Sequence, residues 1–124
     1  MILGFNPQFK QPILDGTKIH SIREDKHKRW KIGRLIHFAT GVRTKLYQQF
    51  LLRTCMGTQK IKIEYDNIPP IGDSATVMID GEFLDFDGME LLAKNDGFES
   101  ISDFFEWFNK DFSGKIIHWT NLKY

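Results

Sequence analysis

The chain has 124 residues, of which 41% are hydrophobic and 27% charged, and its formal net charge is +1. These values are typical of one soluble domain with a single core, and no apolar run is long enough to span a bilayer. The first residues lack the basic and apolar regions of a signal peptide, and a lone cysteine, Cys55, excludes a disulfide framework. We therefore expect a single cytoplasmic domain over residues 1–124.

Charge is distributed unevenly along the chain. Residues 1–62 contain thirteen lysines and arginines against three acids, whereas residues 64–111 contain thirteen acids against two lysines. The first half could present a basic surface to an anion. Alternatively, the two halves attract each other and spread their charge over a solvated surface.

The first third of the chain predicts two short helical turns followed by two strands. Asn6-Pro7 is typical of a helix start, and Pro12 divides the apolar pattern that follows into two turns. Gly16 is expected to end the second turn. Residues 19–24 alternate as a strand does, and residues 34–40 predict a second strand.

The middle of the chain has the composition of β-structure. Residues 50–65 predict one long strand, with Gly57 as a candidate bulge, and residues 66–72 predict a loop. Asp80-Gly81 lies between two short runs of β-formers, 75–79 and 82–86, and predicts a tight hairpin.

The last third changes to a helical period. Asp87 resembles the start of a capping box for a helix through residue 94, and Ser100 predicts a second helix that Gly114 ends. Five apolar side chains at helical spacing should plug the core: Ile101, Phe104, Phe105, Phe108 and Phe112. Residues 115–122 predict a final strand. Five to six strands, with helices after the first segment and before the last strand, indicate an α+β fold built on a small mixed β-barrel.

One segment resembles the motif of a known family. Gly16-Thr-Lys-Ile-His-Ser-Ile-Arg23, followed by Trp30-Lys-Ile-Gly33, resembles the ASCH domain, a member of the PUA-like superfamily. Further segments resemble the family in the same order along nearly the whole chain: Thr40-Gly-Val-Arg-Thr44, Asp96-Gly-Phe98 before Asp103-Phe-Phe105, and Ile116-Ile-His-Trp119. The resemblance implies a PUA-like barrel with a cleft, between barrel and first helix, for RNA or a modified nucleoside.

The same resemblance implies a possible reaction. One branch of small ASCH proteins hydrolyses N4-acetylcytidine to cytidine and acetate, with a lysine as proton acceptor, a threonine as nucleophile and a glutamate as proton donor. The lysine falls on Lys18, and Ser21 stands at the threonine position. The motif arginine falls on Arg23, as a ligand-binding residue. The acid falls on Asp96 by position or on Glu99 by chemistry. The branch has a threonine directly after the lysine, where this chain has isoleucine.

These residue types also suit the chemistry of amide hydrolysis. The reaction needs an activated nucleophile, a base and an acid for the leaving nitrogen. A lysine becomes a base when burial or a neighbouring cation such as Arg23 lowers its pKa. Each residue also has a structural explanation: Lys18 as a solvated cation after a helix, Ser21 as a backbone partner, Arg23 as half of an ion pair, and Asp96 as a turn residue.

Other candidate ligand-binding residues lie outside this group. The basic run of residues 26–34 could bind phosphates while Trp30 stacks on a base, although packing of Trp30 into the barrel rim is the favoured alternative. Arg43 and Thr44 could bind an anion or cap a strand end. The histidines and the cysteine show no metal-ligand spacing, so we expect neither a metal nor a cofactor.

Three functions remain open from the sequence. The first is an ASCH-type module that binds RNA or a modified nucleoside, and the second is an amidohydrolase acting on N4-acetylcytidine or a related acylated base. The third, less favoured, is a protein-interaction domain that uses its charge polarity. We expect no membrane partner, and the sequence does not fix the oligomeric state.

Overall fold

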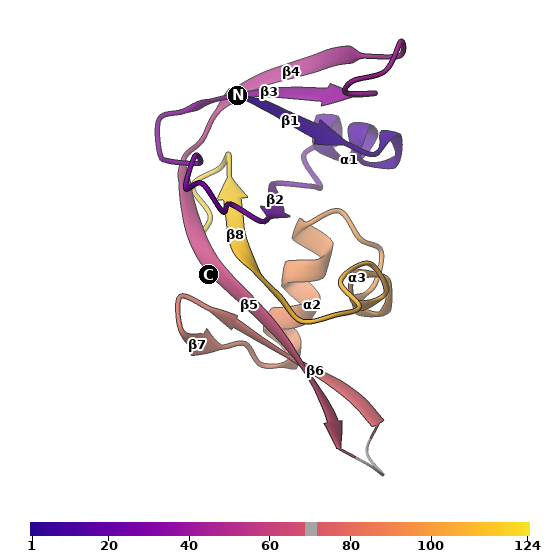
Figure 1. Cartoon of the computed structure of the whole chain (residues 1–124), viewed down its shortest axis with the longest axis vertical. Helices are drawn as coiled ribbons and strands as arrows, with labels where there is room; N and C mark the ends of the chain where they lie inside the picture. Colours follow the sequence, from indigo (N-terminus) through magenta and orange to yellow (C-terminus); the bar gives the residue numbers. More distant parts are fainter. Residues whose placement is uncertain (69–71) are drawn as a thin grey trace.

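A computed structural model describes residues 1–68 and 72–124 of the protein (Figure 1). It is an α+β fold of a three-stranded sheet, a five-stranded sheet and three α-helices, which confirms the predicted class. In chain order the elements are β1 (Ile2–Phe5), the 3-10 helix η1 (Pro7–Phe9), α1 (Lys10–Asp15), β2 (His20–Arg23), β3 (Leu35–Thr40), β4 (Gln48–Thr54), β5 (Gly57–Ile68), β6 (Gly72–Ile79), β7 (Glu82–Phe83), α2 (Phe86–Asn95), α3 (Ile101–Trp107) and β8 (Phe112–His118).

The smaller sheet has the order β1-β3-β4, and the larger has the order β2-β8-β5-β6-β7. Strand β1 runs parallel to β3, and the other pairs are antiparallel. Within the described ranges the two sheets do not close into a barrel. The eight strands found in the described ranges exceed the predicted five to six, and β1 was not predicted because four residues are too short to show a period.

The long strand predicted over residues 50–65 is wrong. Strands β4 and β5 belong to different sheets, and the chain crosses between them at Cys55 and Met56. The Cys55 N–H donates to Arg34 O at 2.7 Å, on the side of the smaller sheet, while Met56 N–H donates to His118 O at 2.8 Å in the larger one. Part of the loop predicted at residues 66–72 is strand, because β5 continues to Ile68 and β6 begins at Gly72; residues 69–71 of that prediction lie outside the described residues.

Predictions of turns and helix ends, which depend on a few adjacent residues, agree better with the structure. Asp80 and Gly81 both have positive φ, 52° and 85°, as a two-residue hairpin turn between β6 and β7 requires. The cap of α2 is Asp85, whose Oδ1 accepts from Gly88 N–H at 2.7 Å, in place of the predicted Asp87. Ser100 caps α3 as predicted, but the helix ends at Trp107, short of Gly114.

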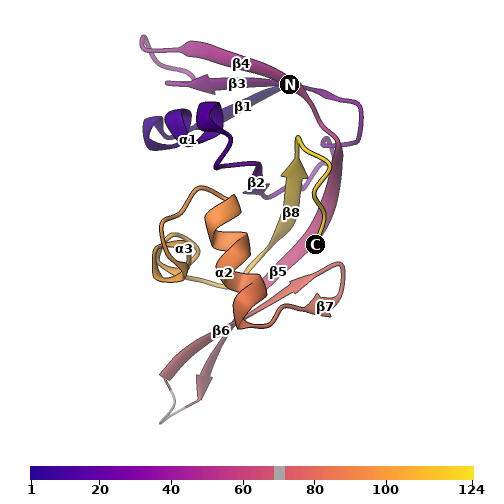
Figure 2. The same ribbon diagram turned by 180° about the vertical axis from the view of Figure 1, so that it is seen from behind.

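The core lies between the sheets and the helices. Helices α2 and α3 lie together on one side of the larger sheet, while α1 lies beside β1 of the smaller one (Figures 1 and 2). Phe104 is fully buried, and its ring centroid lies 5.2 Å from that of Phe105 and 4.9 Å from that of Phe108. The predicted aromatic face of α3 therefore packs into the core. Among the described residues, the helices are too short or too polar to cross a membrane.

Two glycines bring the end of α1 against the end of α2. Gly16, with φ of 81°, ends α1 and turns the chain, so that Thr17 N–H and Lys18 N–H both donate to Pro12 O at 3.0 Å. Gly97, with φ of 93°, lies against the Lys18 side chain, and a Cβ there would lie 3.0 Å from Lys18 Cδ. The lysine is therefore packed against the turn that follows α2.

Candidate active site

Lys18 is buried against the end of α2. Only 3% of the residue is exposed, and its Nζ donates to the backbone oxygen of Asp96 at 2.6 Å and to Asp96 Oδ1 at 3.0 Å. The Phe9 ring centroid lies 4.9 Å from the same nitrogen. Of the two candidate acids, Asp96 therefore faces Lys18, whereas Glu99 is exposed and forms no ion pair with it in the described ranges.

The surroundings of Lys18 favour its neutral form more than water does. Burial lowers the pKa of the Lys18 amine most strongly, and the nearby charge of Arg23 lowers it further, while the Asp96 carboxylate opposes both effects. A buried amine with a lowered pKa can act as a base, and a carboxylate in direct contact can pass its proton on.

Ser21 and Arg23 lie on the same face of β2, as strand alternation predicted. Arg23 Nε donates to Ser21 Oγ at 2.9 Å, and Arg23 Nη2 donates to the backbone oxygen of Gly4 at 2.6 Å. The guanidinium also lies 4.9 Å from the Phe5 ring centroid. Burial lowers the pKa of Arg23, and Asp96 opposes that effect. Between Lys18 Nζ and Ser21 Oγ, the described part of the chain has no hydrogen bond, so the serine is oriented by the arginine.

These four polar residues line one cavity of about 230 Å³. Its polar lining consists of these four residues, Lys18, Ser21, Arg23 and Asp96, and of Asn6. Its apolar wall consists of aromatic side chains from four segments: Phe5, Phe9, Phe98, Trp107 and Phe108. Flat aromatic walls with a few convergent polar groups suit a planar heterocycle that carries an amide.

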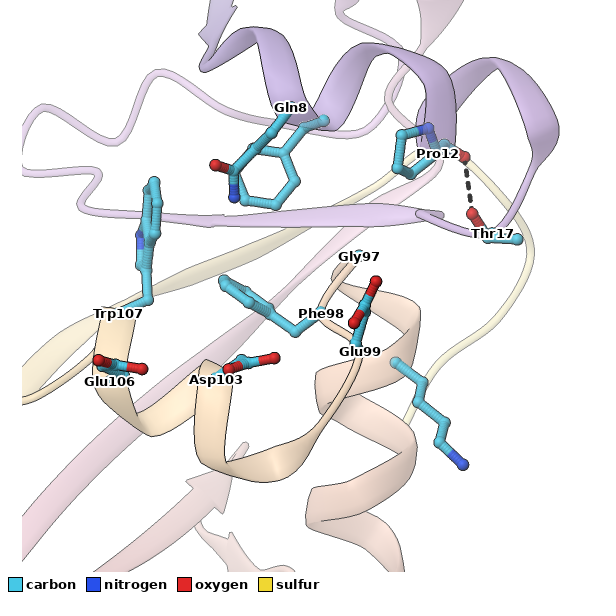
Figure 3. Close-up of a pocket in the computed structure, with 11 residues that line it drawn as sticks. Gln8, Pro12, Thr17, Gly97, Phe98, Glu99, Asp103, Glu106 and Trp107 are labelled. Atoms are coloured by element: carbon cyan, nitrogen blue, oxygen red, sulfur yellow. Dashed lines mark hydrogen bonds between the residues drawn. The ribbon is translucent and has the colours of Figure 1, made fainter.

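A larger groove of about 850 Å³ adjoins the cavity and shares Phe9, Phe98 and Trp107 with it (Figure 3). Three carboxylates line it, those of Glu99, Asp103 and Glu106, together with one lysine. None of the three carboxylates forms an ion pair within residues 1–68 and 72–124. The groove is therefore unfavourable for a phosphate chain and open to an uncharged group.

The other predicted ligand-binding residues lie away from the cavity. Trp30 is 6% exposed and packs in the hydrophobic core, so its ring faces are not available for stacking on a base, and the packing alternative is the one observed. Arg43 and Thr44 lie in the turn between β3 and β4, where Thr44 Oγ1 donates to Gly41 O at 2.7 Å and accepts from Leu46 N–H at 3.1 Å. The threonine closes a turn and does not line the cavity.

Sequence reasoning missed a buried polar cluster behind Asp96. His20 is fully buried and contacts both Asp96 and Tyr124, and the Tyr124 hydroxyl also contacts Asn95. The strand pattern placed His20 opposite Ser21, which is correct, but that face meets the end of α2. Lys18 lies in the turn before β2, so strand alternation gave no signal that His20 and Lys18 share an acid.

His118 lies beside this cluster and predicts a pH dependence of stability. Its Nε2 lies 3.0 Å from Gln59 Oε1, while its Nδ1 is buried and has no partner among the described residues. Burial, followed by the charges of His20 and Lys123, lowers the pKa of His118 to about 4 from 6.5. Between these values the unfolded chain binds the proton and the folded one does not, so falling pH lowers the free energy of unfolding by at most about 3 kcal/mol.

Urea unfolding of the wild type and of His118→Leu at pH 4, 5, 6 and 7 measures this effect. The wild type should lose more free energy of unfolding than the variant as the pH falls from 6.5 to 4, because only the wild type carries the buried imidazole. If the free energy of unfolding depended on pH equally in the two proteins, His118 would bind its proton equally well in the folded and unfolded states.

No group of three metal-ligating side chains occurs in the part of the chain that the structure describes. Comparison of the chain with protein-family models, with curated proteins and with solved structures finds no match. Two observations therefore bear on function, the geometry of the cavity and the motif resemblance.

Proposed function

We propose that the chain is an ASCH-type, PUA-like domain that binds a modified nucleoside in the Lys18 cavity and hydrolyses an acylated base, with N4-acetylcytidine as the substrate. The observation that carries the proposal is the buried contact between Lys18 Nζ and Asp96 Oδ1, at 3.0 Å, in the wall of a cavity that Ser21 also lines. The family motif implies one reaction for Lys18, Ser21 and an acid at Asp96 or Glu99, and Asp96 is the acid that contacts Lys18.

In this reaction Ser21 Oγ attacks the acyl carbon while neutral Lys18 takes the hydroxyl proton. Protonated Lys18 passes this proton to Asp96 Oδ2, the oxygen to which no described residue donates, and the Asp96 carboxyl delivers it from there to the leaving nitrogen as the carbon–nitrogen bond breaks. A water molecule then attacks the acyl-serine and gives a proton to Lys18, and Lys18 returns that proton to Ser21 Oγ as the oxygen–acyl bond breaks. The products are the free amine of the base and the carboxylate, with the last proton released to solvent.

Arg23 assists this attack without supplying the base. Its Nε already donates to Ser21 Oγ, so its charge stabilises an oxygen that becomes more negative as the proton leaves. Lys18 reaches the serine when a bound substrate closes the site, since hydrogen bonds of free active sites often tighten only in the complex.

The size and charge of the site favour a nucleoside over a polynucleotide. A heterocycle fits the aromatic cavity, and its sugar extends into the adjoining groove. The unpaired carboxylates of Glu99, Asp103 and Glu106 in that groove repel the phosphates of an RNA strand.

The test is to incubate the purified protein with N4-acetylcytidine and, separately, with an RNA oligonucleotide that contains the same acetylated base. We expect conversion of the nucleoside to cytidine and at least about tenfold slower conversion within RNA, because like charges oppose binding. Conversion of neither substrate would remove the proposed reaction. Faster conversion of the RNA would retain the chemistry and overturn the assignment of a nucleoside.

Ser21→Ala should lower kcat for N4-acetylcytidine by at least roughly a hundredfold, because it removes the proposed nucleophile and leaves Arg23 in place. Ser113→Ala, at an exposed serine on β8, is the matched control and should retain wild-type rates. Wild-type kcat in the Ser21 variant would instead assign the attack to water activated by Lys18.

A further inference from the structure

We propose that His20 and Tyr124 are positioning residues that hold the Asp96 carboxylate through a chain of hydrogen bonds and leave its second oxygen free for substrate. The positioning serves the reaction above, so its kinetic consequences rest on the proposed function. The hydrogen-bond chain itself can be tested without any substrate.

The hydrogen-bond chain joins four residues from three segments behind the cavity. His20 Nδ1 lies 3.1 Å from Asp96 Oδ1, and His20 Nε2 is hydrogen-bonded to the Tyr124 hydroxyl. The same hydroxyl accepts from Asn95 Nδ2 at 3.0 Å. His20 comes from β2, Asn95 and Asp96 from the end of α2, and Tyr124 from the segment after β8.

The partners favour one direction for each hydrogen bond. The amide nitrogen of Asn95 can only donate, so the Tyr124 oxygen is its acceptor and the Tyr124 proton is available to His20 Nε2. With Nε2 as acceptor, the neutral imidazole carries its proton on Nδ1, and Nδ1–H donates to Asp96. Burial raises the pKa of Tyr124 to about 12, which keeps this hydroxyl protonated and able to donate.

The result is a carboxylate with two different oxygens. Oδ1 of Asp96 accepts from both Lys18 Nζ and His20 Nδ1, whereas Oδ2 makes no hydrogen bond to any residue that the structure describes. Because Asp96 also lines the cavity, Oδ2 is the oxygen left to exchange a proton with a ligand. The groups that face or influence this carboxylate are Lys18, His20, Arg23 and Tyr124.

His20 is placed to prevent rotation of the carboxylate. Lys18 alone could follow Asp96 through several orientations, because an ammonium donates in three directions on a flexible stem. The planar imidazole is packed at 0% exposure, and Tyr124 holds its far nitrogen, so its Nδ1–H points in one direction. This arrangement resembles the way a third group orients a catalytic base.

The strand pairing supplies a matched control. His118 on β8 is the cross-strand partner of His20, equally buried, and the two ring centroids lie 5.4 Å apart. Its Nε2 is bonded to Gln59, not to Asp96. Replacement of either histidine removes a buried imidazole from this pair of neighbouring strands. Only replacement of His20 removes a hydrogen-bond donor from Asp96.

The first test is the nitrogen NMR spectrum of protein labelled with ¹⁵N-histidine. We expect His20 to show a protonated Nδ1 and an unprotonated Nε2, and Tyr124→Phe to shift the Nε2 signal while Nδ1 stays protonated. A His20 protonated on Nε2 alone, or a spectrum unchanged by Tyr124→Phe, would overturn the hydrogen-bond chain. This test needs no substrate, so it stands if the proposed hydrolysis fails.

The second test separates positioning from packing by kinetics. His20→Leu should lower kcat for N4-acetylcytidine by about ten- to a hundredfold with little change in KM, because the acid is misplaced and the cavity walls are intact. His20→Asn places an amide donor near the position of the imidazole Nδ1 and should recover most of the rate. His118→Leu should keep wild-type kcat. Equal kcat losses in His20→Leu and His118→Leu, or no rescue by asparagine, would reduce His20 to a packing residue.

Discussion

Replacement of Lys18 by methionine should lower kcat for N4-acetylcytidine by about a thousandfold, within the range that a general base contributes. Methionine fills nearly the same space against Phe9 and Gly97 but has no nitrogen to accept the serine proton. Lys62→Met, at an exposed lysine on β5, is the control for loss of one positive charge and should keep the wild-type rate. An active Lys18→Met protein would show that another group accepts the proton.

The pH profile of the wild type should identify the same residue. Only the neutral amine of Lys18 can act as a base, so kcat/KM should rise with pH as the amine loses its proton. Because burial lowers the pKa of Lys18, the rise should occur below 10.5, the ordinary value for lysine. Lys18→Arg should be inactive at every pH, because a guanidinium keeps its proton.

The largest expected effect on stability follows from Asp96. Asp96→Ala should lower the free energy of unfolding by about 3–5 kcal/mol, because it leaves the buried Lys18 amine and His20 without their shared acceptor. Adding Lys18→Met should return part of that loss, since no ammonium then remains to be buried. Urea unfolding of the wild type, the two single variants and the double variant measures the coupling between the residues.

The exposed pair of Lys94 and Glu90 provides the comparison for that cycle. Their contact, at 3.4 Å on the surface of α2, is exposed to solvent, so Glu90→Ala should change stability little. Strictly additive losses in the Lys18 and Asp96 cycle would mean that the two side chains do not interact in the folded protein.

The convergence of Lys18, Ser21, Arg23 and Asp96 could be predicted because it depends on local structure and motif order. Gly16 ends α1, β2 begins at His20, and alternation along β2 fixes the shared face of Ser21 and Arg23. Asp96 could be matched only through the family motif, since nothing local to it indicates a partner 78 residues away in the chain.

His20, Tyr124 and Trp107 were missed for different physical reasons. Alternation gives the face of His20 but not what packs against that face, which is the end of α2. Tyr124 lies beyond the last strand, where no period constrains it. Trp107 is 50% exposed and lies outside the helical pattern of phenylalanines that predicted the core, so the pattern did not identify it. It nevertheless lines both the cavity and the groove.

The errors in the assignment of strands share one cause. Turns and caps such as Asp80-Gly81 and Ser100 depend on a few adjacent residues, and these were predicted. The division between β4 and β5 and the pairing of β1 with β3 depend on contacts between distant segments. Propensity for β-structure does not reveal which sheet a strand joins.

The most direct measurement of the central claim is a crystal structure of the Lys18→Met protein grown with N4-acetylcytidine. We predict that the base lies among Phe5, Phe9 and Phe98, with its acyl carbon about 3–3.5 Å from Ser21 Oγ and its N4 nitrogen within hydrogen-bond distance of Asp96. A nucleoside bound elsewhere on the protein, or bound in the cavity with its acyl group turned away from Ser21 and Asp96, would contradict the account.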